Sequence, residues 1–240
     1  MLLLFDIDGT LLLSRGAGAE AVLAACHELF GREFEVERRS FAGHLDPLIW
    51  RDLCARNGVD DPERFHDDFR RTYTRLLGEL FERDVGRAYA LAGVRELLDA
   101  LRERERAGDP LTLGLLTGNY PETGRMKVRA AGLDPAWFPV TVFGDDGPDR
   151  RSLVPVARER HAAHSGRHLD GDRVIVIGDT PRDVDCARAH GCRSLAVATG
   201  SHTLDELERA GADLTLGDLT DTAAVIDWFG LDGPPAARSR

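Results

Sequence analysis

The sequence predicts an α/β fold, a doubly wound parallel sheet with a helical segment inserted near its N-terminus. Six short apolar runs have the length of buried strands, and from residue 111 onward they alternate with segments of helical periodicity. Between the first and second runs, apolar residues instead recur at helical spacing among charges. The six runs read LLLFDID, LTLGLLTG, PVTVFG, RVIVIGD, SLAVATG and DLTLGD.

Composition limits the classes of function. With 240 residues, 42% of them hydrophobic, the chain can bury a large core, and its net charge of -10 opposes general attraction to nucleic acids or anionic membranes. The four cysteines lack the spacing of a zinc site or a disulfide scaffold. The leading MLLLF has no cationic start, and no apolar run reaches 18 residues. We therefore expect a cytoplasmic protein with a small-molecule partner, binding neither nucleic acid nor membrane.

The periodic segments also predict where the chain divides. Residues 14–92 contain no convincing strand and are expected to form a helical cap domain, with flexible edges in SRGAGA and GRAYALAG that suit two hinges. Residues 1–13 and 93–232 would then form the core, and 233–240 a frayed tail. Helices are expected over 121–131, 153–164, 181–190 and 203–210, the last opened by a capping box of Thr203 and Glu206.

Two carboxylates end the first apolar run. Side chains at i and i+2 of a strand point to the same face, so Asp6 and Asp8 would lie side by side where the strand ends. Adjacent anions repel each other and raise each other's pKa, so a bound cation is the simplest means of keeping both charged. In open α/β sheets ligands bind at the carboxyl ends of the strands, so the other strand ends are candidates for the same site.

Polar residues follow three further runs. Thr117, Gly118 and Asn119 offer a hydroxyl and backbone N–H groups of the kind that hold phosphate oxygens. Asp179 ends another run, and Asp183 lies one turn into the helix that follows. Asp145 and Asp146 also follow a run, but are more simply explained as a turn-forming acidic pair.

The order and spacing of DIDGT, LLTGN and GDTPRD resemble the haloacid dehalogenase superfamily, particularly its phosphoglycolate phosphatase-like members. The resemblance covers nearly the whole chain, including a helical cap between the first and second motifs. Each motif alone is weak, since a lone DxD is common on protein surfaces. Together, each at a strand end and in the family's order, they are specific.

The resemblance implies a role for each motif. Asp6 would be the nucleophile that forms an aspartyl-phosphate, and Asp8 the general acid and base. Mg²⁺ would be bound by Asp6, Asp179 and the backbone carbonyl of Asp8, with Asp183 assisting directly or through water. Thr117 would bind the phosphate together with Gly118 and Asn119.

A cation is also required beside the phosphate. Lys127 is the only lysine among 31 Lys and Arg residues and lies ten residues after Thr117. The family's lysine often follows the third strand as KP, where this chain reads DDGPDRRSL with Arg150 and Arg151; a related subgroup places the lysine on the helix, as here. We expect Lys127 to sit between Asp6 and a phosphate oxygen, with the two arginines as the alternative.

Two residues of the FAGHLDP segment, His44 and Asp46, fall where relatives approach the substrate. His44 is a candidate substrate-binding residue, and a partly buried structural histidine is the alternative interpretation.

The leading hypothesis is a Mg²⁺-dependent phosphomonoesterase acting on a small metabolite, with the cap closing over the site. A dehalogenase of the same fold fits less well, because it needs no metal and lacks the acid that Asp8 supplies. A sugar-phosphate mutase would carry a histidine in the first hinge, and SRGAGAE has none. A binding protein that had lost its chemistry would be expected to lack at least one of the acids. Phosphoglycolate, a sugar phosphate and a nucleoside monophosphate all remain open as substrates.

Overall fold

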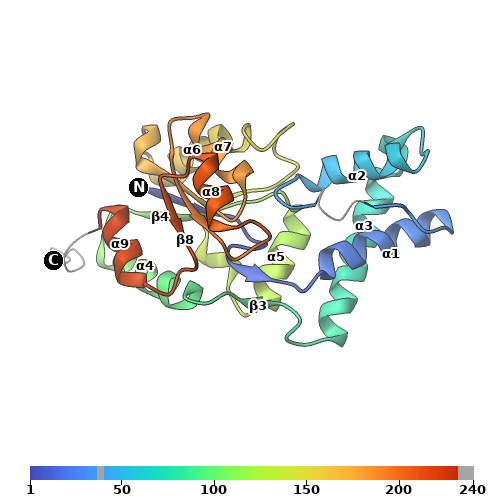
Figure 1. Cartoon of the computed structure of the whole chain (residues 1–240), viewed down its shortest axis with the longest axis horizontal. Helices are drawn as coiled ribbons and strands as arrows, with labels where there is room; N and C mark the ends of the chain where they lie inside the picture. The colour runs from blue at the N-terminus through green and yellow to red at the C-terminus, as the bar shows by residue number, and fades with distance from the viewer. Residues whose placement is uncertain (37–40, 232–240) are drawn as a thin grey trace.

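A six-stranded parallel sheet forms the centre of the computed structural model, which describes residues 1–36 and 41–231 (Figure 1). Each strand coincides with one of the six apolar runs, with β7 beginning one residue before its run, so all six strand predictions are confirmed. The sheet has the order β5-β4-β1-β6-β7-β8 and every neighbouring pair is parallel. Its strands are β1 (Leu2–Phe5), β4 (Thr112–Leu116), β5 (Val140–Val142), β6 (Val174–Gly178), β7 (Arg193–Val197) and β8 (Leu214–Leu216).

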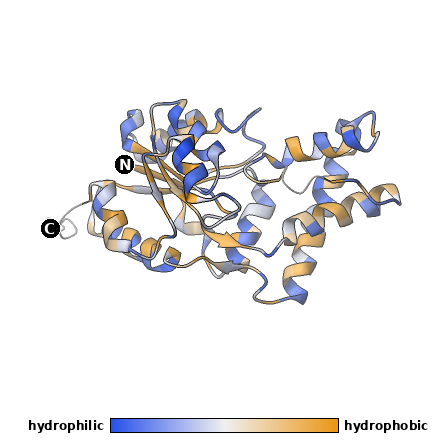
Figure 2. Ribbon diagram, viewed as in Figure 1, coloured by the Kyte–Doolittle hydropathy of each residue, from blue (hydrophilic) through white to orange (hydrophobic). Residues whose placement is uncertain are grey.

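Helices cover both faces of the sheet, because alternate side chains of each strand point to opposite faces. Leu3 and Phe5 belong to a core cluster shared with α4, α5 and α9, whereas Leu2 and Leu4 pack in a second cluster with α6 and α7. Figure 2 shows the apolar strands enclosed by helices whose outer faces are hydrophilic. These helices, with α8, are α4 (Val94–Ala107), α5 (Pro121–Ala130), α6 (Leu153–Ser165), α7 (Pro181–Arg188), α8 (Leu204–Ala210) and α9 (Thr222–Phe229).

The four predicted helices of this part form α5, α6, α7 and α8, and each differs from its predicted bounds by no more than two residues at either end. Thr203 lies just outside α8 as its N-cap and forms the predicted capping box with Glu206. Two short 3₁₀ turns, Pro135–Trp137 and Gly171–Arg173, complete the connections.

Three helices, α1 (Ala17–Phe30), α2 (Asp46–Arg56) and α3 (Pro62–Arg83), lie to one side of the sheet (Figure 1). They share a core cluster of their own, in which Trp50 and Phe69 stack with ring centroids 4.2 Å apart. The core residue Tyr120 also packs into this cluster. We call α1–α3 the helical group.

The expectation that residues 14–92 contain no strand is wrong at one end. Tyr89–Ala90 forms β3, which pairs antiparallel with β2 (Leu12–Leu13), so the two chain segments entering and leaving the helical group are hydrogen-bonded to each other. Two-residue strands carry too little periodicity to be recognised from sequence. The predicted tail, 233–240, lies outside the described residues. Among those described, each helix is too short or too polar to cross a membrane.

Candidate active site

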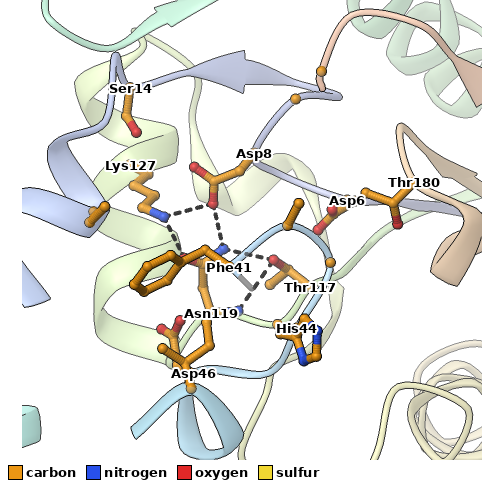
Figure 3. Close-up of a pocket in the computed structure, with 18 of the residues that line it drawn as sticks. Asp6, Asp8, Ser14, Phe41, His44, Asp46, Thr117, Asn119, Lys127 and Thr180 are labelled. Carbon is orange, nitrogen blue, oxygen red and sulfur yellow. Dashed lines mark hydrogen bonds and ion pairs between the residues drawn. The ribbon is translucent and has the colours of Figure 1, made fainter. Parts of the chain in front are cut away.

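The carboxyl ends of β1, β4 and β6 converge, together with the helical group, on a pocket of about 430 Å³ (Figure 3). Strand β1 brings Asp6 and Asp8 to its floor, as parallel strands place their ends at one edge of a sheet. The helical group closes the other side with apolar residues such as Val22 and Ile49. The predicted site residues that line this pocket are Asp6, Asp8, His44, Thr117, Gly118, Asn119, Lys127 and Asp179.

Three buried carboxylates form an acidic cluster at one end of the pocket. Asp6, Asp179 and Asp183 each offer an oxygen atom, and these atoms all lie within 4.8 Å of one another. Burial, together with the neighbouring carboxylates of Asp183 and Asp6, raises the pKa of Asp179 to about 8. Burial likewise raises the pKa of Asp6 to about 6, against the opposing effect of Arg150. A cluster of this kind can hold a divalent metal ion, because hard cations prefer carboxylate oxygens and would relieve the repulsion.

Asp183 is less available to a metal than the other two acids. Its Oδ1 atom accepts hydrogen bonds from Arg150 Nε at 3.0 Å and from Arg150 Nη2 at 2.5 Å. Its Oδ2 atom accepts from Thr180 N at 3.1 Å and Thr180 Oγ1 at 2.7 Å, as part of the capping box that opens α7. Asp6 and Asp179 therefore suit direct contact with a metal ion. For Asp183 the sequence left two roles open, direct contact and contact through water, and its hydrogen bonds favour the second.

The cation beside Asp6 is Arg150, which differs from the expectation for Lys127. Arg150 is 7% exposed, and its Nη2 atom lies 3.2 Å from Asp6 Oδ2. The same guanidinium group forms an ion pair with Asp183. Arg151 points elsewhere and forms an exposed ion pair with Asp185 at 2.6 Å. The pair considered as one alternative thus divides into a buried site residue and a surface residue.

Lys127 lies in the pocket but contacts Asp8 (Figure 3). Its Nζ donates to Asp8 Oδ2 at 2.7 Å and to Asn119 Oδ1 at 2.6 Å, and the residue is 5% exposed. Asn119 Nδ2 donates to the same Asp8 oxygen at 2.9 Å. Both contacts fix Oδ2, whereas Asp8 Oδ1 accepts no hydrogen bond from the residues that the structure describes.

Asn119 uses its amide within the protein. Its Oδ1 atom accepts from Lys127, and its Nδ2 atom donates to Asp8 and, at 2.8 Å, to Thr117 Oγ1. The hydroxyl of Thr117 accepts this bond and keeps its hydrogen for donation. Gly118 allows a close approach, because a Cβ there would lie 1.9 Å from the carbonyl oxygen of His44. This arrangement suits Thr117 for contact with a ligand and Asn119 for holding its neighbours.

The segment 41–46 brings the helical group against the strand ends. His44 lines the pocket and contacts Arg182 of α7. The pKa of His44 is lowered mainly by burial, and the charge of Arg182 also lowers it. Asp46 N donates to Gly118 O at 2.7 Å, and its Oδ2 accepts from Tyr120 N at 2.8 Å. Asp46 therefore ties α2 to the start of α5.

The pKa of Asp46 gives a testable pH dependence. Burial raises it from 3.8 to about 6, although Lys127 and the Tyr120 N–H lower it. Between about pH 4 and pH 6 the carboxyl group is still protonated in the folded state but ionised in the unfolded state. The contribution of Asp46 to the free energy of unfolding therefore falls as the pH rises through this window. We expect Asp46→Asn, which keeps an oxygen for the Tyr120 N–H, to gain stability relative to wild type over that window, by at most about 3 kcal/mol and less where solvent screens the group.

Urea unfolding of both proteins at several pH values measures this difference. A difference in the free energy of unfolding that stays constant across the window would contradict the assignment.

Asp145 and Asp146 follow β5 but do not line this pocket. Asp145 pairs with Arg70 at 3.0 Å and Asp146 with Arg160 at 2.6 Å, and Asp146 also accepts a hydrogen bond from Phe143 N. The interpretation as a structural acidic pair fits these contacts. Sequence reasoning instead missed the end of β7, where Gly200 and Ser201 line the pocket.

The comparison with family models decides the identity of the fold. Residues 3–188 match the model described as haloacid dehalogenase-like hydrolase. The chain belongs to this family. This match confirms the predicted resemblance. Curated relatives of the chain are phosphatases, which confirms the prediction of a phosphatase of this family.

Two such relatives carry different substrate names. A phosphoglycolate phosphatase of Rhodospirillum rubrum is 26% identical over 98% of this chain and 93% of its own length. A phosphoserine phosphatase of Thermus thermophilus is 30% identical over 76% of this chain and 65% of its own.

Solved structures agree on the fold. A hydrolase from Pseudomonas syringae has a TM-score of 0.71 and 22% identity, covering 94% of this chain and 97% of its own. A Bacteroides vulgatus protein assigned as a β-phosphoglucomutase has a TM-score of 0.70 and 20% identity, covering 96% and 88%. At these identities the likeness concerns the fold alone.

Proposed function

We propose that this protein is a Mg²⁺-dependent phosphomonoesterase that hydrolyses a small phosphorylated metabolite through an aspartyl-phosphate on Asp6. One observation carries the proposal: the two acids that follow β1 have different surroundings in one pocket. Asp6 lies in the acidic cluster beside Arg150, whereas Asp8 lies beside Lys127 and Asn119. Two carboxylates in distinct environments suit two distinct roles.

In the first step, an Asp6 carboxylate oxygen attacks phosphorus and the ester P–O bond breaks. Asp8, protonated, gives its proton to the departing alkoxide from Oδ1, the oxygen that its neighbours leave available. The side chain of Asp8 is 41% exposed, in keeping with contact with a ligand. The alcohol then leaves with the phosphoryl group on Asp6.

In the second step, the Asp8 carboxylate takes a proton from water while the water oxygen attacks phosphorus. The bond between Asp6 and phosphorus breaks, inorganic phosphate is released, and both acids return to their starting states. Lys127 holds the Oδ2 atom of Asp8 in place in both steps, and it compensates the negative charge that Asp8 carries between giving up its proton and taking one from water.

Asp6, Asp179 and the backbone carbonyl of Asp8 would bind the Mg²⁺, and Asp183 would assist through water, because its two oxygens already accept hydrogen bonds from Arg150 and Thr180. When bound, the ion neutralises charge on the transferring phosphoryl group and holds it in line for attack. The helical group, whose residues form the apolar side of the pocket, would act as the cap that selects the alcohol and excludes water. Phosphoglycolate, phosphoserine, sugar phosphates and nucleoside monophosphates are the substrates to compare.

Metal removal tests this proposal. We expect phosphate release from an aryl phosphate, and from the best member of a metabolite panel, to be lost in EDTA and restored by added Mg²⁺. The reason is that Asp6 and Asp179 would otherwise remain crowded, partly protonated acids. Full activity after exhaustive chelation would contradict the metal dependence. Return of the phosphoryl group to another position of a sugar, without release of phosphate, would identify a mutase instead.

A further inference from the structure

The connection that follows β7 folds over the acidic cluster. Thr199 Oγ1 donates to the carbonyl oxygen of Gly9 at 2.5 Å, which ties this connection to the loop that follows β1. The next two residues, Gly200 and Ser201, line the pocket. The connection therefore reaches the site from a strand two positions away from β1 in the sheet.

Asp179 occupies a narrow slot between two glycines. A Cβ at position 200 would lie 1.7 Å from Asp179 Oδ2 and 2.7 Å from its Cγ. A Cβ at position 9 would also lie close, 2.4 Å from the same Oδ2 atom. Thr10 Oγ1 also donates to Asp179 Oδ1 at 3.3 Å. The carboxylate thus has little space to move toward either glycine.

This slot opposes the repulsion within the cluster. Asp179 is 3% exposed and faces Asp6 and Asp183, so a free carboxylate would reduce its energy by rotating away from them. The close approach of Gly9 and Gly200 to its Oδ2 atom limits the positions that the carboxylate can take. A ligand whose rotamer is fixed by its surroundings binds a cation without reorganising first.

We propose that the Thr199–Gly200 connection positions Asp179 for the divalent cation. Gly200 supplies the close contact, and the Thr199 hydroxyl holds the connection and the Gly9 backbone together. The inference rests on the proposed function, because it takes Asp179 to be a metal ligand. Gly200 and Thr199 are positioning residues, since they act through Asp179 and the backbone of Gly9.

Gly200→Ala tests the contact. The φ angle of Gly200 lies outside the left-handed region, unlike that of Gly9 at +82°, so alanine adds a methyl group without backbone strain of that kind. Gly217→Ala is the matched control, because a Cβ there would meet nothing within 4 Å and its φ also lies outside that region. Isothermal titration with Mg²⁺ and with Mn²⁺, in the absence of substrate, gives the metal affinity of each protein.

We expect Gly200→Ala to bind both cations at least about ten-fold more weakly than wild type, as is typical when support of a metal ligand is lost, and Gly217→Ala to bind like wild type. The Mg²⁺ concentration for half-maximal activity should rise by the same factor. Activity at saturating Mg²⁺ should recover, which damage to the fold alone would not allow.

Thr199→Val is the second variant, and it removes the hydroxyl while keeping the side-chain shape. It should also weaken metal binding. If Gly200→Ala shows no cooperative thermal transition, Thr199→Val alone tests whether the connection positions Asp179. Wild-type affinity in folded Gly200→Ala, or in Thr199→Val where only that variant folds, would overturn the inference. Failure of the wild-type protein to bind either cation would contradict the metal-dependent function itself.

Discussion

Asp6→Asn is expected to abolish turnover of every substrate that the wild-type protein hydrolyses. An amide oxygen is a poor nucleophile toward phosphorus, and the substitution also removes one anion from the acidic cluster. Because Asp6 is buried between Arg150 and the other acids, the neutral side chain occupies nearly the same space. Loss of activity would then report chemistry more than packing.

Steady-state phosphate release from the purified variant measures its catalytic activity, and circular dichroism measures separately whether it is folded. Asp145→Asn is a suitable control, because Asp145 also follows a strand of the sheet but does not line the pocket. A folded Asp6→Asn protein with substantial turnover would show that the nucleophile is a different group.

Lys127→Ala is expected to lower kcat/KM roughly a hundred- to a thousand-fold, about 2.7–4 kcal/mol of transition-state stabilisation by analogy with other preorganised electrostatic donors. The substitution leaves Asp8 without its cation and Asn119 without the donor to its Oδ1. Asp8, the acid and base of the proposed mechanism, would then lose its charge partner and keep only the Asn119 contact to its Oδ2 atom.

Two arginine variants complete this comparison. Arg151→Ala should stay close to wild type, because Arg151 pairs with Asp185 on the surface. Arg150→Ala should lose activity and also stability, on the order of 3–5 kcal/mol, because a buried cation between Asp6 and Asp183 would be missing.

Activity of folded Lys127→Ala within roughly ten-fold of wild type would contradict the role given to this lysine.

The strands and the meeting point of the motifs could be predicted because both depend on local patterns. Apolar runs such as that of β1 mark buried strands, and parallel strands bring their carboxyl ends to one edge whatever the details of packing. Asp6, Thr117 and Asp179 therefore share a pocket, as expected.

The partners of the cations could not be predicted in the same way. Lys127 was identified by being unique, but whether it meets Asp6 or Asp8 depends on how α5 is rotated and placed against β1, which no local pattern encodes. Arg150 and Arg151 are adjacent in sequence, yet only one of them points into the core. Sequence alone offers no means of separating two such neighbours.

The ends of β5 and β7 show the same limit. Asp145 after β5 attracts attention as an acid, whereas Gly200 after β7 does not, although Gly200 lines the pocket. What brings Gly200 there is the tie between Thr199 and Gly9, a contact across 190 residues of sequence. A glycine that serves by leaving space carries no chemical signal of its own.

The phosphorylated intermediate tests the central claim most directly. Asp8→Asn keeps the nucleophile but removes both the acid of the first step and the base of the second. An aryl phosphate has a leaving group that needs little protonation, so with this substrate and Mg²⁺ the phosphoenzyme should form and accumulate. Acid quenching, proteolysis and mass spectrometry of the peptide that contains Asp6 would locate the phosphoryl group. We expect it on Asp6 in Asp8→Asn and absent from the double variant that also carries Asp6→Asn. A phosphoryl group found on any other residue would contradict the assignment of Asp6 as the nucleophile.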